Sequence, residues 1–139
     1  MKAINNYLLR FALTAALLTA LFRCFLSYGI THEAIVLITV SSILYAIGMS
    51  LAGWYWGKKE KDHIPIYDVG FRFHLATYLV FNVVSEGWFF LGFNSGIEKI
   101  ETVRSVACLW GFFLFIHFIY FIWTRKKTIN NIDKTELFE

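Results

Sequence analysis

The chain has 139 residues, of which 58% are hydrophobic and 19% aromatic, and its formal net charge is only +3. This composition excludes an ordinary soluble domain and leaves room for a single domain, residues 1–139. The basic residues stand in short flanks beside apolar stretches rather than along one face, so we expect no nucleic-acid partner.

Four apolar stretches follow one another along the chain, at residues 7–28, 34–56, 70–93 and 103–123. Each is long enough, at ~1.5 Å per residue, to cross a hydrocarbon layer ~30 Å thick. The sequence therefore predicts an all-α integral membrane protein, a bundle of four transmembrane helices in the lipid bilayer. Residues 124–139 are expected to form a polar cytoplasmic tail.

The positive charges predict the orientation of these helices. Ten of the thirteen Lys and Arg residues flank the N-terminus, the central loop and the tail, two lie in the third loop, and Arg23 lies within the first stretch. Basic residues accumulate on the cytoplasmic side of membrane proteins. We therefore expect a multi-pass protein of a bacterial inner (cytoplasmic) membrane with both termini in the cytoplasm.

Two charged residues in the outer half of the membrane predict an ion pair. Arg23 stands five residues before Tyr28, which places it about 7 to 8 Å below the outer surface. Glu86 follows Gly70 by sixteen residues and lies about 24 Å up its helix, at nearly the same depth. Because lone charges are unfavourable in hydrocarbon, we expect Arg23 and Glu86 to pair. The pair is interpreted as a structural clamp, with a gate or proton-sensitive site as the alternative.

Polar residues spaced four, four and three apart line one face of the third stretch, and Glu86 is adjacent to that face. His117 on the fourth stretch lies about 9 Å deep, between the levels of His74 and Tyr78, so a hydrogen bond from His117 to either residue is feasible. The sequence thus predicts an intramembrane polar seam made of His74, Tyr78, Asn82, Ser85, Glu86 and His117.

Two histidines on facing helices could also ligate a metal or a haem iron. A zinc site needs further ligands at matching depth, and Glu86 is too far along its helix to supply one. We therefore expect interhelical hydrogen bonding, with no metal and no cofactor. An enzyme is not expected, and no catalytic residue is assigned, because Glu86 and the histidines do not converge on one cleft.

The seam also carries a family pattern. His74-Leu75, Tyr78 and Asn82, followed by Trp110-Gly111, Leu114 and His117, resemble the bacterial "2TM domain", a helical hairpin frequent in Bacteroidota. The resemblance covers residues 70–124, and its positions are His74, Tyr78, Asn82, Trp110, Gly111 and His117. It implies a small membrane protein or the membrane hairpin of a sensor kinase, with a poorly defined role. The chain departs from the pattern at Leu109, where the family usually has glycine.

Three kinds of function remain open from the sequence. The first is a non-enzymatic membrane module that packs or oligomerises in the bilayer, as a homo-oligomer or with a membrane partner protein, and docks or signals to that partner. The second is an oligomeric ion-conducting or membrane-permeabilising pore lined by Glu86, Arg23 and the seam. The third is a haem- or metal-binding redox protein that uses His74 and His117.

Overall fold

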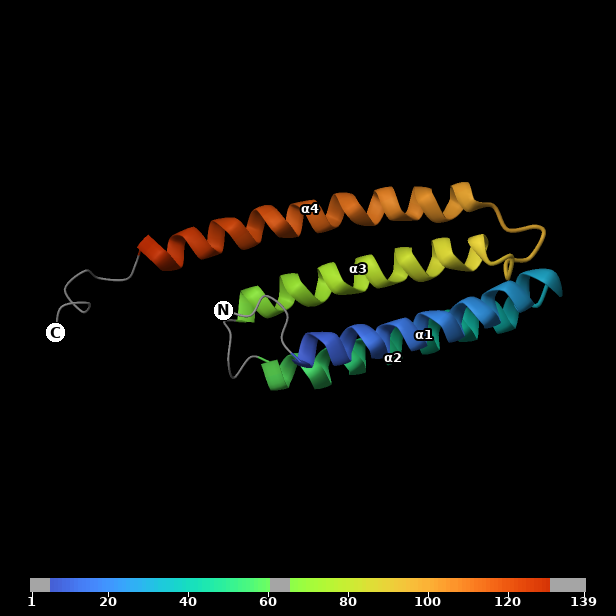
Figure 1. Ribbon diagram of the computed structural model, residues 1–139, viewed down its shortest axis with the longest axis horizontal. Helices are drawn as coiled ribbons and strands as arrows, with labels where there is room; N and C mark the ends of the chain where they lie inside the picture. Colours follow the sequence, from blue (N-terminus) through green and yellow to red (C-terminus); the bar gives the residue numbers. More distant parts are fainter. Residues whose placement is uncertain (1–5, 61–65, 131–139) are drawn as a thin grey trace.

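The computed structural model describes residues 6–60 and 66–130 and shows an all-α chain. Its four helices are α1 (Asn6–Thr31), α2 (Ile35–Glu60), α3 (Ile66–Phe90) and α4 (Ile100–Asn130). They run nearly side by side (Figure 1). The prediction of four helices is confirmed.

Three helix ends differ by four residues or more from the predicted limits: the end of α2, the end of α4 and the start of α3, which is Ile66 rather than Gly70. α2 continues to Glu60, and its last turn holds Lys58 and Lys59, whose positive charge suits the C-terminal end of a helix dipole. α4 continues beyond Trp123 to Asn130, so the first part of the predicted tail is helical. Once a helix has formed in its apolar segment, extending it into the polar flank has a small cost in free energy, because each added residue contributes another backbone hydrogen bond.

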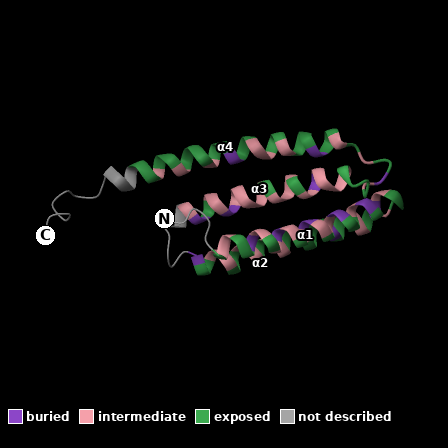
Figure 2. Ribbon diagram, viewed as in Figure 1, coloured by how far each residue is buried: buried purple, intermediate pink, exposed green. Residues whose placement is uncertain are grey.

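The helices form an open stack rather than a closed bundle. α1 and α2 lie together, α3 packs mainly on α1, and α4 lies on the far side of α3 (Figure 1). Among the described helices, α4 contacts α3 alone. Most of the α4 surface is therefore exposed, whereas buried residues recur along α1 (Figure 2).

The contact between α1 and α3 fixes their relative register. α1 buries one residue in every four along a single face: Phe11, Ala15, Thr19, Arg23 and Ser27. At one end the Phe11 ring packs against the Phe73 ring, with centroids 4.5 Å apart, and at the other the Trp88 indole donates to Ser27 Oγ at 3.0 Å. The two helices thus run parallel along their whole length.

Three of the four described helices are long and apolar enough to cross a membrane: α1, α2 and residues 100–126 of α4. These candidate spans indicate a multi-pass membrane protein. α3 is also 25 residues long, but it is not among these candidates, and it carries charged and polar side chains that include Arg72, His74 and Glu86. Its packed position between α1 and α4 gives these side chains protein neighbours.

Candidate functional site

A buried ion pair lies at the end of the molecule where α3 is joined to α4. Arg23 Nη2 donates to Glu98 Oε2 at 2.6 Å, and the two side chains are only 4% and 6% exposed. The other carboxylate oxygen of Glu98 accepts the backbone N–H of Ser95 at 3.2 Å. The Arg23 guanidinium also lies over the Phe89 ring, 5.4 Å from its centre. The pair therefore fastens the α3–α4 loop onto α1.

The predicted pair between Arg23 and Glu86 is wrong. Glu86 instead accepts from Arg104 Nε at 3.2 Å, and both side chains of that pair are exposed, at 44% and 63%. The α1–α3 register places Glu86 close to the level of Arg23, as the helical rise predicts. Depth does not fix the direction of a side chain, however, and Glu86 turns toward α4 rather than α1.

The middle of the α3–α4 contact is a chain of three ring side chains. The Trp110 indole nitrogen donates to His74 Nε2 at 2.7 Å, and His74 Nδ1 lies 2.9 Å from His117 Nδ1. Phe71 meets the His117 ring edge-on, with centroids 5.8 Å apart. The structure therefore brings together His74 and His117, as the sequence predicted, and adds Trp110 as their hydrogen-bond donor.

The geometry of this chain assigns the ring protons. An indole N–H can only donate, so His74 Nε2 must accept and the proton of a neutral His74 must be on Nδ1. That proton is donated to His117 Nδ1, which places the proton of His117 on Nε2. The two hydrogen bonds therefore run in one direction, with Trp110 donating to His74 and His74 donating to His117. A proton added to Nε2 of His74 removes the acceptor of the bond from Trp110. A proton added to Nδ1 of His117 removes the acceptor of the bond from His74.

The remaining seam residues do not form one continuous network. Tyr78 Oη donates to the Ala107 carbonyl of α4 at 3.3 Å, and Gly111 is the close-approach position beside it, since a Cβ there would lie 3.2 Å from Tyr78 Oη. Asn82 bonds within its own helix, to the Tyr78 carbonyl at 2.7 Å. Ser85 is fully buried, and within the described residues its Oγ has no hydrogen-bond partner.

Sequence reasoning also missed a charge cluster at the opposite end. Glu60 is fully buried, and its carboxylate lies 3.3 Å from Arg72 Nη1, while Arg72 Nε lies 3.4 Å from Asp68. Glu60 and Glu98 both lie outside the four apolar stretches of the sequence, so hydropathy gives no reason to expect them to be buried. The spacing of four between Asp68 and Arg72 is a signal for the local pair. No sequence signal points to the long-range partners, because they depend on how the loops fold back.

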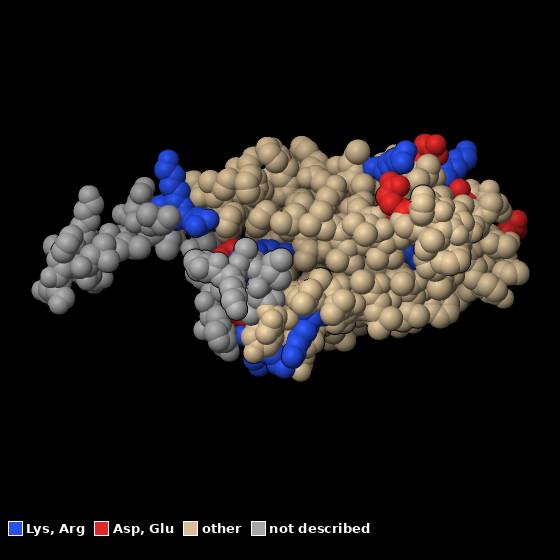
Figure 3. Space-filling view, viewed as in Figure 1, with Lys and Arg blue, Asp and Glu red and all other residues tan. Residues whose placement is uncertain are grey.

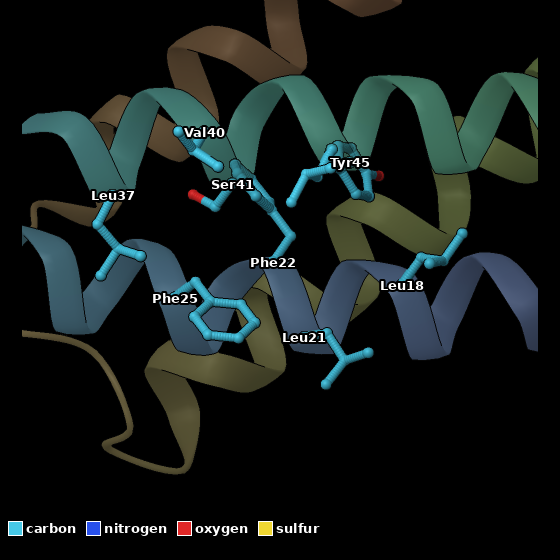
Figure 4. Close-up of a pocket in the computed structure, with 9 residues that line it drawn as sticks. Leu18, Leu21, Phe22, Phe25, Leu37, Val40, Ser41 and Tyr45 are labelled. Atoms are coloured by element: carbon cyan, nitrogen blue, oxygen red, sulfur yellow. The ribbon is translucent and has the colours of Figure 1, made fainter.

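A narrow apolar groove separates α1 from α2 on the face turned away from α4 (Figure 4). Its volume is about 220 Å³. The two polar side chains in its wall bond elsewhere: Ser41 Oγ donates to the Ile38 carbonyl at 3.0 Å, and Tyr45 Oη lies 3.1 Å from Thr19 Oγ1. The groove therefore offers an apolar surface and suits neither a polar substrate nor an ion. Its lining consists of Leu18, Leu21, Phe22, Phe25, Leu37, Val40, Ser41, Leu44 and Tyr45.

The histidine geometry fits a hydrogen bond better than a shared metal. Two nitrogens on one tetrahedral zinc, at about 2.0 to 2.1 Å each, would lie about 3.3 Å apart, and two on opposite sides of one metal would lie about 4 Å apart. The two Nδ1 atoms lie 2.9 Å apart, and the other nitrogen of His74 already accepts from Trp110. In the part of the chain that the structure describes, no three His, Cys, Asp or Glu residues gather in a way that could hold a metal ion.

Comparison with protein-family models, with curated proteins and with solved structures finds no match to this chain. The resemblance of residues 70–124 to the 2TM domain therefore stays a prediction from the sequence. What the chain does must be argued from its own geometry.

Proposed function

We propose that this chain is a non-enzymatic membrane module that crosses the bilayer four times, with both termini in the cytoplasm. In this proposal the module associates through α4 with a second copy or with a membrane partner protein. The observation that carries it is the one-sided packing of α4, which contacts α3 alone among the described helices. The α3–α4 hairpin is also the part that resembles the 2TM domain.

The free face of α4 supports this role. Cys108, Phe112, Phe115 and Ile119 follow one another at helical spacing, so they share one face, and all four are exposed. Phe112, Phe115 and Ile119 are 59%, 58% and 53% exposed. A broad surface of this kind lets a second helix pack by van der Waals contact, which drives helix association in lipid.

The attachment of α4 supports a signalling role as well. Part of its link to α3 is formed by neutral hydrogen bonds between His74, His117 and Trp110, which contribute about 0.6 kcal/mol each in membrane proteins. A partner that binds α4 can therefore break these particular bonds at a small cost in free energy. An added proton has a similar effect, because it breaks one link of the chain.

The chain contains its own probes for the test. Cys108 of α4 and Cys24 of α1 are both exposed, and they lie at similar depth, eight residues from Ile100 and seven from Thr31. The experiment compares Cys24→Ser, which leaves only Cys108, with Cys108→Ser, which leaves only Cys24. Both proteins are oxidised in native membranes, and the disulfide-linked species are separated by size.

We expect cross-linking through Cys108, either to a second copy or to a partner that mass spectrometry then identifies, and little through Cys24. Equal cross-linking through both cysteines would show random collision. Cross-linking through Cys24 alone would place the interface on α1. Either of these two results would contradict the proposed role of α4.

A further inference from the structure

Three cations from two helices gather at the end of the molecule where α1 begins and α2 ends. Arg10 belongs to the first turns of α1, and Lys58 and Lys59 to the last turn of α2. All three are exposed. Figure 3 shows Lys and Arg side chains gathered there, beside the residues drawn in grey.

Aromatic rings hold these cations in place. The Arg10 guanidinium and Lys59 Nζ both lie against the Trp56 ring, 5.9 and 5.3 Å from its centre. Lys59 Nζ also lies 4.2 Å from the centre of the Tyr55 ring and donates to Tyr55 Oη at 2.7 Å. Lys58 Nζ lies 5.7 Å from the centre of the Trp54 ring. Such contacts with ring faces attract cations, so each of the three charges is held against an aromatic ring of α2.

None of the three cations forms an ion pair within the described residues. The carboxylate of Glu60, the next residue along α2, is turned to Arg72 instead. Within the described residues this positive charge therefore has no counter-charge. A partner of complementary negative charge is attracted to this end of the molecule.

The surroundings identify that partner as part of the membrane. Trp54, Tyr55 and Trp56 form an aromatic cluster at the end of a candidate span, and such clusters lie at the level of the lipid headgroups. At that level the anion at high local concentration is the lipid phosphate. Arg binds phosphate through paired N–H groups, and Lys binds it as a point charge.

We propose that Arg10, Lys58 and Lys59 form a binding site for the phosphate of an anionic lipid, with Trp56 as the wall that aligns Arg10 of α1 and Lys59 of α2 on one headgroup. The site prefers an anionic lipid to phosphatidylcholine, because choline neutralises the phosphate of the latter. The proposed lipid site requires a bilayer, but it does not require a particular side of the membrane for the termini or an association through α4. It can therefore be tested independently of the proposed role of α4.

The test is a titration of the full chain with lipid in neutral detergent. The measured quantity is the midpoint of thermal unfolding, which rises as a ligand binds the folded state. Phosphatidylglycerol, phosphatidylcholine and inorganic phosphate are the three probes. The variants are Arg10→Gln and Lys59→Gln. The matched control is Arg125→Gln with Lys126→Gln, which removes exposed cations near the C-terminal end of α4.

We expect phosphatidylglycerol alone to raise the midpoint of the unaltered protein. Arg10→Gln and Lys59→Gln should each weaken its apparent affinity about fivefold, the equivalent of about 1 kcal/mol for each cation near an anionic surface. The control variant should bind as the unaltered protein does, and Lys59→Arg should retain the affinity because it keeps the charge.

Three results would overturn the site. Equal loss in the control variant would show diffuse attraction to the whole basic surface. Equal stabilisation by phosphatidylcholine would show a detergent-like effect, and equal stabilisation by inorganic phosphate would show a free-anion site. Should a Gln variant fail to fold, the three probes still separate an anionic lipid from a detergent-like effect and from a free anion. The control variant still shows whether the cations of α4 contribute to the binding.

Discussion

The two arginines of α1 stand 13 residues apart on one helix and are balanced in opposite ways. Arg23 is 4% exposed and pairs with Glu98 of the same chain, whereas Arg10 is exposed, lies over Trp56 and has no ion pair among the described residues. The protein neutralises the charge that lies in its interior. At the other end it leaves an exposed charge that, in the lipid site proposed above, an anionic headgroup neutralises.

The largest effect should come from removing the partner of the buried arginine. Glu98→Gln leaves Arg23 buried without a counter-charge, and we expect the free energy of unfolding to fall by about 3 to 5 kcal/mol. The measurement is reversible unfolding in mixed detergent. If the free energy of unfolding fell only as much as it does for an exposed ion pair, Arg23 would reach water, and it would be solvated in the same way as Arg10.

The double variant Arg23→Leu with Glu98→Leu should recover at least half of that loss, because it removes both charges and leaves apolar side chains in their place. The same unfolding assay measures it. If the double variant is no more stable than Glu98→Gln, then the loop depends on Glu98 for its bond to Ser95 rather than for its charge.

Breaking neutral bonds between α3 and α4 should have a smaller effect than unpairing a charge. Trp110→Phe keeps the ring but removes the donor to His74, and we expect a loss of about 0.6 kcal/mol and at most about 1.7 kcal/mol. Trp123→Phe, at an exposed position of the same helix, is the control and should leave the stability unchanged. If Trp110→Phe lowered the free energy of unfolding as much as Glu98→Gln does, the bonds at the histidines would be the main attachment of α4 to the rest of the protein.

Glu86→Gln should lower the stability by about 0.2 to 1 kcal/mol, since its pair with Arg104 is exposed. The pairing expected from the sequence would have made this the most damaging carboxylate change at this end of the molecule. Comparing Glu86→Gln with Glu98→Gln under one set of conditions therefore tests directly which carboxylate serves Arg23.

The smallest change is expected at the other arginine. Without anionic lipid, Arg10→Gln should alter the free energy of unfolding by no more than about 0.5 kcal/mol, as is usual for exposed substitutions. Its effect should emerge only when phosphatidylglycerol is added. A large loss in neutral detergent would show that Arg10 stabilises the fold itself and would remove the contrast with Arg23.

The sequence predicted what depends on position along a helix and failed where direction around the helix decides. Hydropathy and helical rise placed the four helices and brought His74 level with His117. They could not show that Glu86 faces α4, because depth constrains only one coordinate. Nor could they find Glu98, whose meeting with Arg23 depends on the path of a loop that has no periodic pattern.

α4 also bears on how the chain is made. Because it touches only α3 among the described helices, α1, α2 and α3 can complete their mutual contacts while α4 is still being synthesised. The bond between Arg23 and Glu98 can form only once the loop before α4 has emerged, and it then ties the start of the last helix to the first. The order of synthesis thus favours packing of α4 on α3 of its own chain, before α4 can pack on α3 of another copy.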